Sequence, residues 1–222
     1  MKPYTEKEIK DSMCLYAVTD SMWLNGRTLP QVVEEALEGG ATFMQIREKN
    51  MPYEELVKLA KEVKMVTDRY HVPYVVDDEV EIAKEIDADG VHIGQSDKAL
   101  LEARKILGPD KIIGVSAQTV EQAVEAEKNG ADYLGVGSIF TTSTKLDADD
   151  VSLETLRRIC DAVSIPVVAI GGINRDNILD LKGTNVDGVA VVSAIFAAKD
   201  IEKDTAELLK TARQLVSDFC KK

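Results

Sequence analysis

Gln45, Arg47 and Lys49 place an amide and two cations at alternate positions at the end of a short apolar segment. If this segment is a strand, alternate side chains point to one face, and these three share that face. Arg offers a planar fork of donors and Lys a compact charge, so the pair suits the oxygens of a phosphate chain. From this segment alone, solvated charges paired with a neighbouring acid are an equally favoured interpretation.

Three acids follow two later apolar segments. Asp77 and Asp78 end one segment, and Asp97 comes shortly after the next. Neighbouring parallel strands lie about 4.8 Å apart, so carboxylates at two such ends can share one ion. Mg²⁺ typically takes one or two carboxylates and completes its shell with waters and phosphate oxygens. The alternative is that these acids cap the helices that follow, a role that is compatible with metal binding.

Two late turns carry small residues that favour phosphate binding. Gly171 and Gly172 follow one apolar segment, and Val192 and Ser193 end the last one. Glycines let backbone N–H groups approach a ligand closely, and barrel enzymes frequently bind a phosphate after strands 7 and 8. A tight turn without ligand is the alternative for the two glycines.

The segment 137–150 supplies Thr142, Thr144 and Lys145. Hydroxyls and a cation can hold anionic oxygens, although a solvated loop is the favoured interpretation of these residues alone. A connection of this length inside a compact domain is more often a functional lid than filler.

Other catalytic patterns are missing from the sequence. His71 and His92 have no Cys or His nearby, which does not favour a zinc site; we expect His92 to be structural or a minor ligand contact and His71 to lie in a loop. Neither a nucleophile elbow nor a Cys/His pairing is present. Cys14, Cys160 and Cys220 are far apart and predict inert thiols in a reducing compartment.

The elements that position these residues alternate along the whole chain. Eight short apolar runs predict strands at 14–19, 41–46, 73–77, 90–94, 112–116, 131–137, 165–172 and 187–194. Segments with apolar residues at helical spacing follow them, at 30–38, 53–66, 80–86, 98–107, 119–128, 151–163, 174–182 and 200–219. This count predicts an α/β fold, a (β/α)8 TIM barrel, formed by residues 1–222 as a single domain.

A barrel would also explain where the polar residues fall. It would bury Ala41 and Phe43 in its core and project the later polar residues of that strand toward the carboxyl ends, where barrel active sites lie. The competing doubly wound sheet favours a glycine-rich loop after the first strand. The chain has Val-Thr-Asp-Ser-Met there instead, and its glycine-rich turns come late.

Composition excludes several function classes. The formal net charge of −12 disfavours nucleic acid as a partner. No stretch reaches the roughly 18 apolar residues of a membrane span, and the amino-terminal segment lacks the apolar core of a signal peptide, so we expect a cytoplasmic protein without membrane contact. An acidic protein must attract phosphates through local cations, metal and backbone N–H groups.

The order QIREK, Asp-Asp, HIGQSD, GVSAQT, GSIFTTSTK, VVAIGGIN and GVAVVSAI resembles the thiamine phosphate synthase family, from about Leu15 to Ile195. The resemblance implies a magnesium-dependent transferase that joins a pyrimidine diphosphate to a thiazole phosphate and releases pyrophosphate. It further implies that Arg47, Lys49, Ser116 and Lys145 are catalytic.

The resemblance assigns the remaining roles residue by residue. It places Gln45, Arg47 and Lys49 on the pyrimidine diphosphate, Asp78 and Asp97 on Mg²⁺, Ser116 near the reacting pyrimidine, Thr142, Thr144 and Lys145 on the closing loop, and Gly172, Val192 and Ser193 around the thiazole phosphate. Three positions depart from the family: Asp77 stands where Asn is usual and also faces the diphosphate, and Ser138 and Thr141 stand where Pro is common.

Two alternative functions remain at this point. A thiazole tautomerase of the same fold would act on thiazole phosphate without a diphosphate clamp or metal pair. A non-catalytic sensor would bind both phosphate ligands without releasing pyrophosphate. The sequence leaves a homo-oligomer open, and it does not decide whether Asp77 contacts metal or diphosphate.

Overall fold

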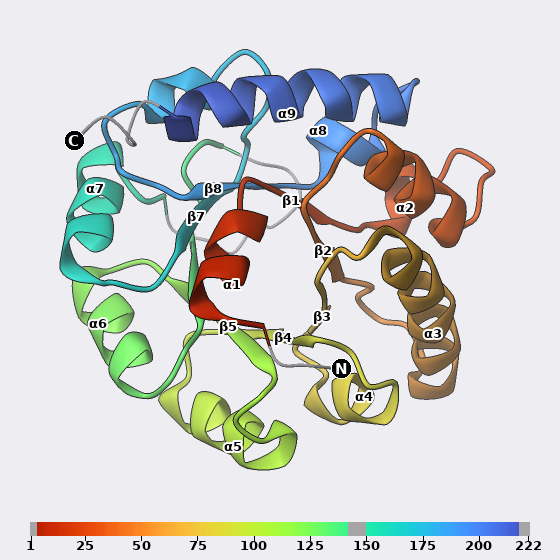
Figure 1. Ribbon diagram of the computed structural model, residues 1–222, viewed down its shortest axis with the longest axis horizontal. Coiled ribbons are helices and arrows are strands. Elements are labelled where there is room, and N and C mark those ends of the chain that lie inside the picture. Colours follow the sequence, from red (N-terminus) through yellow and green to blue (C-terminus); the bar gives the residue numbers. More distant parts are fainter. Residues whose placement is uncertain (1–3, 142–149, 218–222) are drawn as a thin grey trace.

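The eight predicted strands form a closed parallel barrel in the computed structural model, which describes residues 4–141 and 150–217 (Figure 1). They are β1 (Leu15–Val18), β2 (Phe43–Ile46), β3 (Tyr74–Asp77), β4 (Gly90–Ile93), β5 (Ile112–Ala117), β6 (Tyr133–Val136), β7 (Val167–Ile170) and β8 (Gly188–Val191). Each strand pairs with its neighbour in sequence, and β8 pairs with β1. The (β/α)8 prediction is therefore confirmed.

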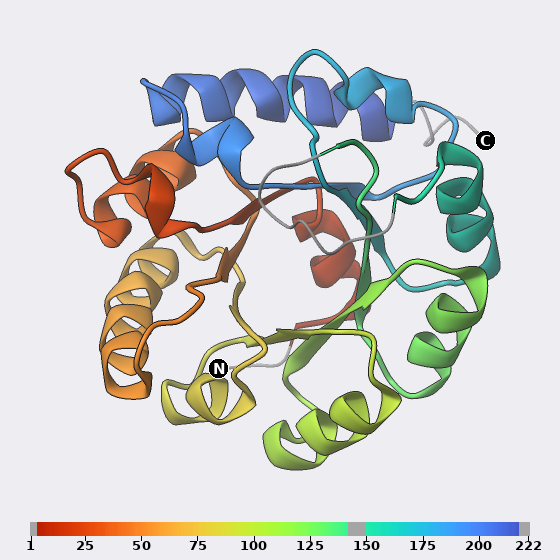
Figure 2. The same cartoon turned by 180° about the vertical axis from the view of Figure 1, so that it is seen from behind.

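Helices surround this barrel and cover its outer surface (Figure 2). They are α2 (Leu29–Glu38), α3 (Tyr53–Tyr70), α4 (Val80–Glu85), α5 (Asp97–Leu107), α6 (Val120–Lys128), α7 (Leu153–Ala162) and α9 (Ile201–Ser217). Local signals explain where some of them begin: reciprocal capping boxes join Thr28 to Gln31 at α2 and Thr119 to Gln122 at α6. Their apolar faces pack on the outward side chains of the strands.

The prediction of a helix over 174–182 is wrong. The structure has only a short 3₁₀ helix, η2 (Ile178–Leu181), and a four-residue helix, α8 (Ser193–Phe196), after β8. Asn side chains explain the loss of regular helix before η2. Asn177 Oδ1 accepts from the Asn174 N–H, and Asn174 Oδ1 accepts from the Asp176 N–H, so local side-chain bonds replace helical ones.

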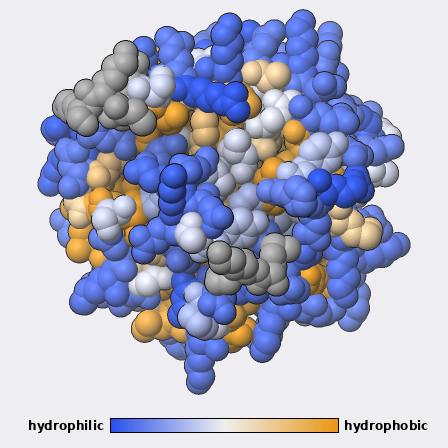
Figure 3. Space-filling model, in the orientation of Figure 1, coloured by the Kyte–Doolittle hydropathy of each residue, from blue (hydrophilic) through white to orange (hydrophobic). Residues whose placement is uncertain are grey.

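Two amino-terminal elements were not predicted: α1 (Glu6–Ser12) and the 3₁₀ helix η1 (Ser21–Trp23). Figure 1 shows α1 lying across the centre of the barrel at one end. Its Ile9 and the following Met13 belong to the apolar cluster inside the barrel. The amino-terminal end of the barrel is thus closed by packed side chains. That end of the surface is mainly hydrophilic, with small separate hydrophobic patches (Figure 3).

Aromatic rings fill the middle of the barrel. The Tyr16, Phe43 and Tyr133 rings pack against one another with centroids 4.5 to 5.9 Å apart. Gly114 makes room for one of them, because a Cβ atom there would lie 2.0 Å from Tyr133 Cζ. The expectation that Ala41 and Phe43 are both buried is confirmed. However, Ala41 packs in the layer between strands and helices, because β2 begins only at Phe43.

None of the helices among residues 4–141 and 150–217 is long and apolar enough to cross a membrane.

Candidate active site

A cavity occupies the carboxyl-terminal half of the barrel, and we call it the mouth cavity. Its volume is about 1030 Å³ when its open entrance is included. It is lined by side chains and turns from every strand, namely Tyr16, Val18, Gln45, Arg47, Asp77, His92, Gln95, Ser116, Gln118, Gly135, Gly137, Ser138, Val168, Ile170, Gly171, Gly172, Ile173, Ala190, Val191, Val192 and Ser193. Barrel active sites lie at this end.

The three residues that alternate along β2 do come together at the mouth cavity. Gln45 is buried in its wall, Arg47 lines it, and Lys49 lies beyond them at the rim with a half-exposed side chain. Their positions follow from strand geometry, since one face of β2 begins with Phe43 in the core and ends in these polar groups.

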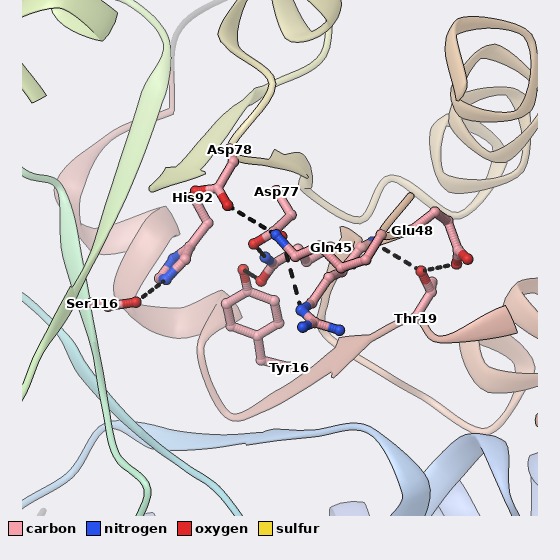
Figure 4. A network of polar contacts seen from close by, with 10 residues as sticks. Tyr16, Thr19, Gln45, Glu48, Asp77, Asp78, His92 and Ser116 are labelled. Carbon is pink, nitrogen blue, oxygen red and sulfur yellow. Dashed lines mark hydrogen bonds and ion pairs between the residues drawn. The ribbon is translucent and has the colours of Figure 1, made fainter. Parts of the chain in front are cut away.

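The carboxylates of Asp77 and Asp78, both labelled in Figure 4, converge on Lys49. The Lys49 Nζ atom lies 2.7 Å from Asp77 Oδ2 and 2.9 Å from Asp78 Oδ2, and Arg47 Nε lies 3.8 Å from Asp77 Oδ2. Partial burial lowers the pKa of Lys49, but hydrogen bonds and charge from Asp77 and Asp78 outweigh burial and raise the pKa above its usual value. The rim therefore holds a firmly charged ammonium.

The neighbouring acid Glu48 has a different role. Its carboxylate accepts from the Thr19 hydroxyl at 2.8 Å and from the Ser21 N–H at 3.2 Å. The same Thr19 hydroxyl accepts from the Arg47 N–H at 3.0 Å. These bonds fix the end of β2 against the loop after β1, with the Arg47 side chain facing the cavity.

The acids are not helix caps. Glu79 is the N-cap of α4 and makes no side-chain cap bond, so Asp77 and Asp78 do not have that role. Asp78 has a left-handed backbone, with φ of 59°, and its N–H donates to the His92 carbonyl at 2.8 Å. This conformation is uncommon for a residue other than Gly, and it places the Asp78 carboxylate at Lys49.

Asp97 begins α5, and Ser96 rather than Asp97 is the N-cap, because the Ser96 hydroxyl accepts from the Ala99 N–H. The Asp97 side chain lies outside the part of the chain that the structure describes. Thr142, Thr144 and Lys145 also lie outside the described residues.

A chain of hydrogen bonds crosses the floor of the mouth cavity, and sequence reasoning missed the two tyrosines at its centre, Tyr16 and Tyr133. Ser116 Oγ lies 3.1 Å from His92 Nε2, and His92 Nδ1 lies 3.0 Å from the Tyr133 hydroxyl. The Tyr133 hydroxyl lies 2.8 Å from that of Tyr16, which donates to Gln45 Oε1 at 2.7 Å. His92 thus contacts the predicted site residue Ser116 directly.

This chain takes one polar side chain from each of the strands β1 to β6 and ends where Gln45 Nε2 donates to Asp77 Oδ1 at 2.7 Å. Burial raises the pKa of Tyr16 well above its usual value, and the nearby Tyr133 and Asp77 add to this effect. Burial raises the pKa of Tyr133 as well. Both hydroxyls therefore keep their protons. The available signal in the sequence was a polar or aromatic residue at an inward position of each strand.

The two glycines after β7 lie against the loop after β6. A Cβ atom at Gly172 would lie 2.6 Å from the Thr141 carbonyl oxygen, and one at Gly171 would lie 2.2 Å from Ser138 Oγ. Both glycines have positive φ, 101° at Gly171 and 63° at Gly172. Only glycine fits these positions, and the turn lets Gly172 border the cavity beside Val192 and Ser193.

A model of the family described as thiamine monophosphate synthase matches residues 15–195. The thiamine-phosphate synthase of Clostridium tetani is 52% identical over 194 residues, which cover 87% of this chain and 93% of that protein. The thiamine-phosphate synthase of Clostridioides difficile is 50% identical over 199 residues, which cover 90% and 95%.

A solved structure gives the same result. The thiamine phosphate pyrophosphorylase from Pyrococcus furiosus is 44% identical, with a TM-score of 0.86 over 94% of this chain and 99% of that one. The resemblance inferred from the order of motifs is confirmed, and it covers all eight strands. The chain belongs to the thiamine monophosphate synthase family.

Proposed function

We propose that this chain is a transferase that joins 4-amino-2-methyl-5-pyrimidinylmethyl diphosphate to 4-methyl-5-(2-phosphooxyethyl)thiazole, giving thiamine phosphate and pyrophosphate. The observation that carries the proposal is the position of Arg47 and Lys49, which bring two cations to the rim of one cavity in an otherwise acidic protein. The identity of 52% to a protein named thiamine-phosphate synthase supports it.

The reaction exchanges one bond for another. The bond between the pyrimidine methylene carbon and the diphosphate oxygen breaks, and its electron pair leaves with pyrophosphate. The ring amino group stabilises the resulting cation, and the thiazole nitrogen then forms the new carbon–nitrogen bond. The protein must stabilise departing negative charge and hold two substrates in line.

Arg47 and Lys49 meet the first need. Their cations stand at the cavity rim, where a diphosphate would replace the carboxylates of Asp77 and Asp78 as their nearest anions. Gln45 holds the base of this group in place, because its amide is buried and bonded at both ends. A preorganised charge of this kind needs no rearrangement as the leaving group departs.

Magnesium fits the acids beside these two cations. Asp77 and Asp78 already place carboxylate oxygens around one cation, the Lys49 ammonium, and carboxylate oxygens are ligands that Mg²⁺ prefers. We assign Asp78 and Asp97 to the ion, with Asp77 facing the diphosphate. When bound, the ion would neutralise charge on the leaving diphosphate.

The second substrate is assigned to the opposite side of the cavity. Gly172, Val192 and Ser193 border it there, and Gly172 offers backbone without a side chain in the way. We propose that they hold the thiazole phosphate and that Thr142, Thr144 and Lys145 close over the phosphates. Ser116 faces the space between the two sides, where the pyrimidine would lie.

The proposal takes residues 1–222 as one catalytic domain, because the family match already includes all eight strands. It also takes the protein as cytoplasmic. In support, Cys14 and Cys160 are free thiols, as is usual in a reducing compartment.

The direct test is to mix both substrates with Mg²⁺ and measure thiamine phosphate and pyrophosphate separately. We expect equal amounts of the two products, and neither product when one substrate is omitted. Ligand binding without pyrophosphate release would favour a sensor, and conversion of thiazole phosphate alone in the presence of a chelator would favour a tautomerase. Either result would overturn the proposal.

A further inference from the structure

The hydrogen bonds on the cavity floor have a direction that the donors and acceptors themselves determine. We call these residues the polar relay, in order Asp77, Gln45, Tyr16, Tyr133, His92 and Ser116. Figure 4 shows both ends of this relay, with Asp77 beside Gln45 and His92 beside Ser116.

The direction is set at the Asp77 end. Asp77 forms ion pairs with Lys49 and Arg47, and a carboxylate only accepts hydrogen bonds. The amide nitrogen of Gln45 must therefore face Asp77, where Nε2 and Oδ1 lie 2.7 Å apart. This orientation turns the amide oxygen of Gln45 toward the Tyr16 hydroxyl, which must donate to it.

At each later residue, the preceding bond determines which atom donates and which accepts. A hydroxyl has one proton. Since Tyr16 donates its proton to Gln45, its oxygen must accept from the Tyr133 hydroxyl, 2.8 Å away. The Tyr133 oxygen must in turn accept from His92 Nδ1, which therefore carries a proton.

The last bond, between His92 and Ser116, determines whether the Ser116 hydroxyl donates or accepts. In a neutral imidazole with the proton on Nδ1, Nε2 is an acceptor. The Ser116 hydroxyl, 3.1 Å from His92 Nε2, must then donate its proton inward. Only lone pairs of Ser116 Oγ are left to face the mouth cavity, which Ser116 lines.

We propose that Asp77, acting through the polar relay, fixes Ser116 as a hydrogen-bond acceptor toward the cavity and so selects a ligand with an N–H donor at that point. Asp77, Gln45, Tyr16, Tyr133 and His92 are positioning residues in this account; of these, Tyr133 does not line the cavity. The inference about the ligand rests on the proposed function, in which the donor is the ring amino group of the pyrimidine.

The proposal has a consequence for the reaction. The amino group gains positive charge when the methylene cation forms, and a more positive N–H is a stronger donor. An acceptor fixed in place beside it binds the cation more tightly than the neutral substrate. A serine that donated toward the ligand would oppose this charge instead.

The protonation state of His92 can be measured in the free protein. The chain has two histidines, so ¹⁵N-labelled imidazole signals of His92 and His71 can be resolved in long-range ¹H–¹⁵N spectra. Recorded at about pH 8, the spectra should show one imidazole proton on His92, located on Nδ1, since a neutral imidazole has one donor and one acceptor nitrogen. A proton on Nε2, or on both nitrogens, would overturn the proposal.

Two variants test whether the relay is the cause. Asp77→Asn offers a donor as well as an acceptor to Gln45, so we expect the Nδ1 proton to become shared between the two nitrogens. Tyr133→Phe removes the partner of Nδ1, and we expect the same loss. The matched control is Tyr74→Phe, since Tyr74 is also fully buried but its hydroxyl bonds to the Ala60 carbonyl outside the relay. Wild-type spectra in Asp77→Asn would contradict the role of Asp77.

Ligand choice is tested by equilibrium binding of 4-amino-5-hydroxymethyl-2-methylpyrimidine and its 4-oxo analogue. The wild type should prefer the amino compound, and Tyr133→Phe should reduce the ratio of the two dissociation constants roughly tenfold, the scale of one hydrogen bond. Equal affinity of the wild type for both compounds would refute the acceptor role of Ser116. The spectra need no turnover, so they can fail or succeed independently of the proposed reaction.

Discussion

The ammonium of Lys49 lies 2.7 Å from one carboxylate oxygen of Asp77, at the edge of the mouth cavity. The same ammonium reaches Asp78 at 2.9 Å, so two acids hold one cation where strands β2 and β3 end. A protein of net charge −12 thereby holds an ammonium group at the proposed place of diphosphate departure.

The two cations at the cavity rim, Arg47 and Lys49, should control turnover without controlling folding. We expect Arg47→Ala to retain the fold and to lose roughly 10²–10³-fold in kcat, the usual cost of removing one preorganised charge contact. Steady-state kinetics with both substrates measure this. The matched control is Arg69→Ala, because Arg69 pairs with Glu34 on the outer helices, away from the cavity. Near-normal turnover of Arg47→Ala would contradict its role.

Metal dependence should distinguish Asp78, a proposed magnesium ligand, from ordinary surface carboxylates. A chelator should abolish pyrophosphate release, and added Mg²⁺ should restore it. We expect Asp78→Asn to raise the Mg²⁺ concentration for half-maximal rate by at least roughly tenfold. Asp68→Asn is the control, since Asp68 pairs with Lys64 within α3, away from the cavity. An unchanged magnesium requirement in Asp78→Asn would exclude Asp78 as a ligand.

The interior of the barrel should tolerate no added atom beside Tyr133. Gly114→Ala would place a Cβ atom 2.0 Å from the Tyr133 ring, so we expect a loss of about 1–3 kcal/mol or more in the free energy of unfolding. Gly94→Ala is the matched control, because a Cβ atom at Gly94 would have no neighbour within 4 Å. Urea unfolding of both variants measures the difference, and equal stability would contradict the packing.

Cys160 should resist alkylation in the folded protein. Burial, with added repulsion from Asp187 and Asp161, raises the pKa of the Cys160 thiol to about 12 from the usual 9.0. At pH 8 its reactive thiolate is then about a thousandfold scarcer than that of an ordinary thiol. Because the unfolded chain releases this proton first, the stability due to the neutral thiol is complete below pH 9 and is lost as pH rises toward 12.

Mass spectrometry of the Cys160 peptide after timed alkylation measures this rate. The same peptide from urea-unfolded protein is the control and should react at the ordinary rate. Equal rates in the two states would show that the thiol is exposed.

Most of the fold could be predicted, because buried parallel strands appear as short apolar runs and their helices as amphipathic segments. All eight runs contain a strand; most strands are shorter than their run by one to three residues at one or both ends, and β5 extends one residue beyond its run. The segment 174–182 misled the prediction because its apolar spacing is helical, while bonds from Asn174 and Asn177 favour a turn. Such competition depends on side-chain geometry that periodicity does not contain.

The site was predictable where charge marks it and not where neutral residues form it. Arg47 and Lys49 stand out because they are cations at alternate positions at the end of an apolar strand. Tyr16 and Tyr133 do not stand out, because an aromatic residue in a strand is ordinary core. Their hydroxyls meet only because the strands close into a barrel and bring β1 and β6 across from each other.

The position of a bound diphosphate tests the roles of Arg47, Lys49 and Asp78 most directly. A crystal structure of the protein with Mg²⁺ and pyrophosphate should show the pyrophosphate against Arg47 and Lys49. The Mg²⁺ ion should be bound by Asp78 and by phosphate oxygens. Pyrophosphate bound at any other part of the barrel, with the Lys49 ammonium still paired to Asp77, would contradict these roles.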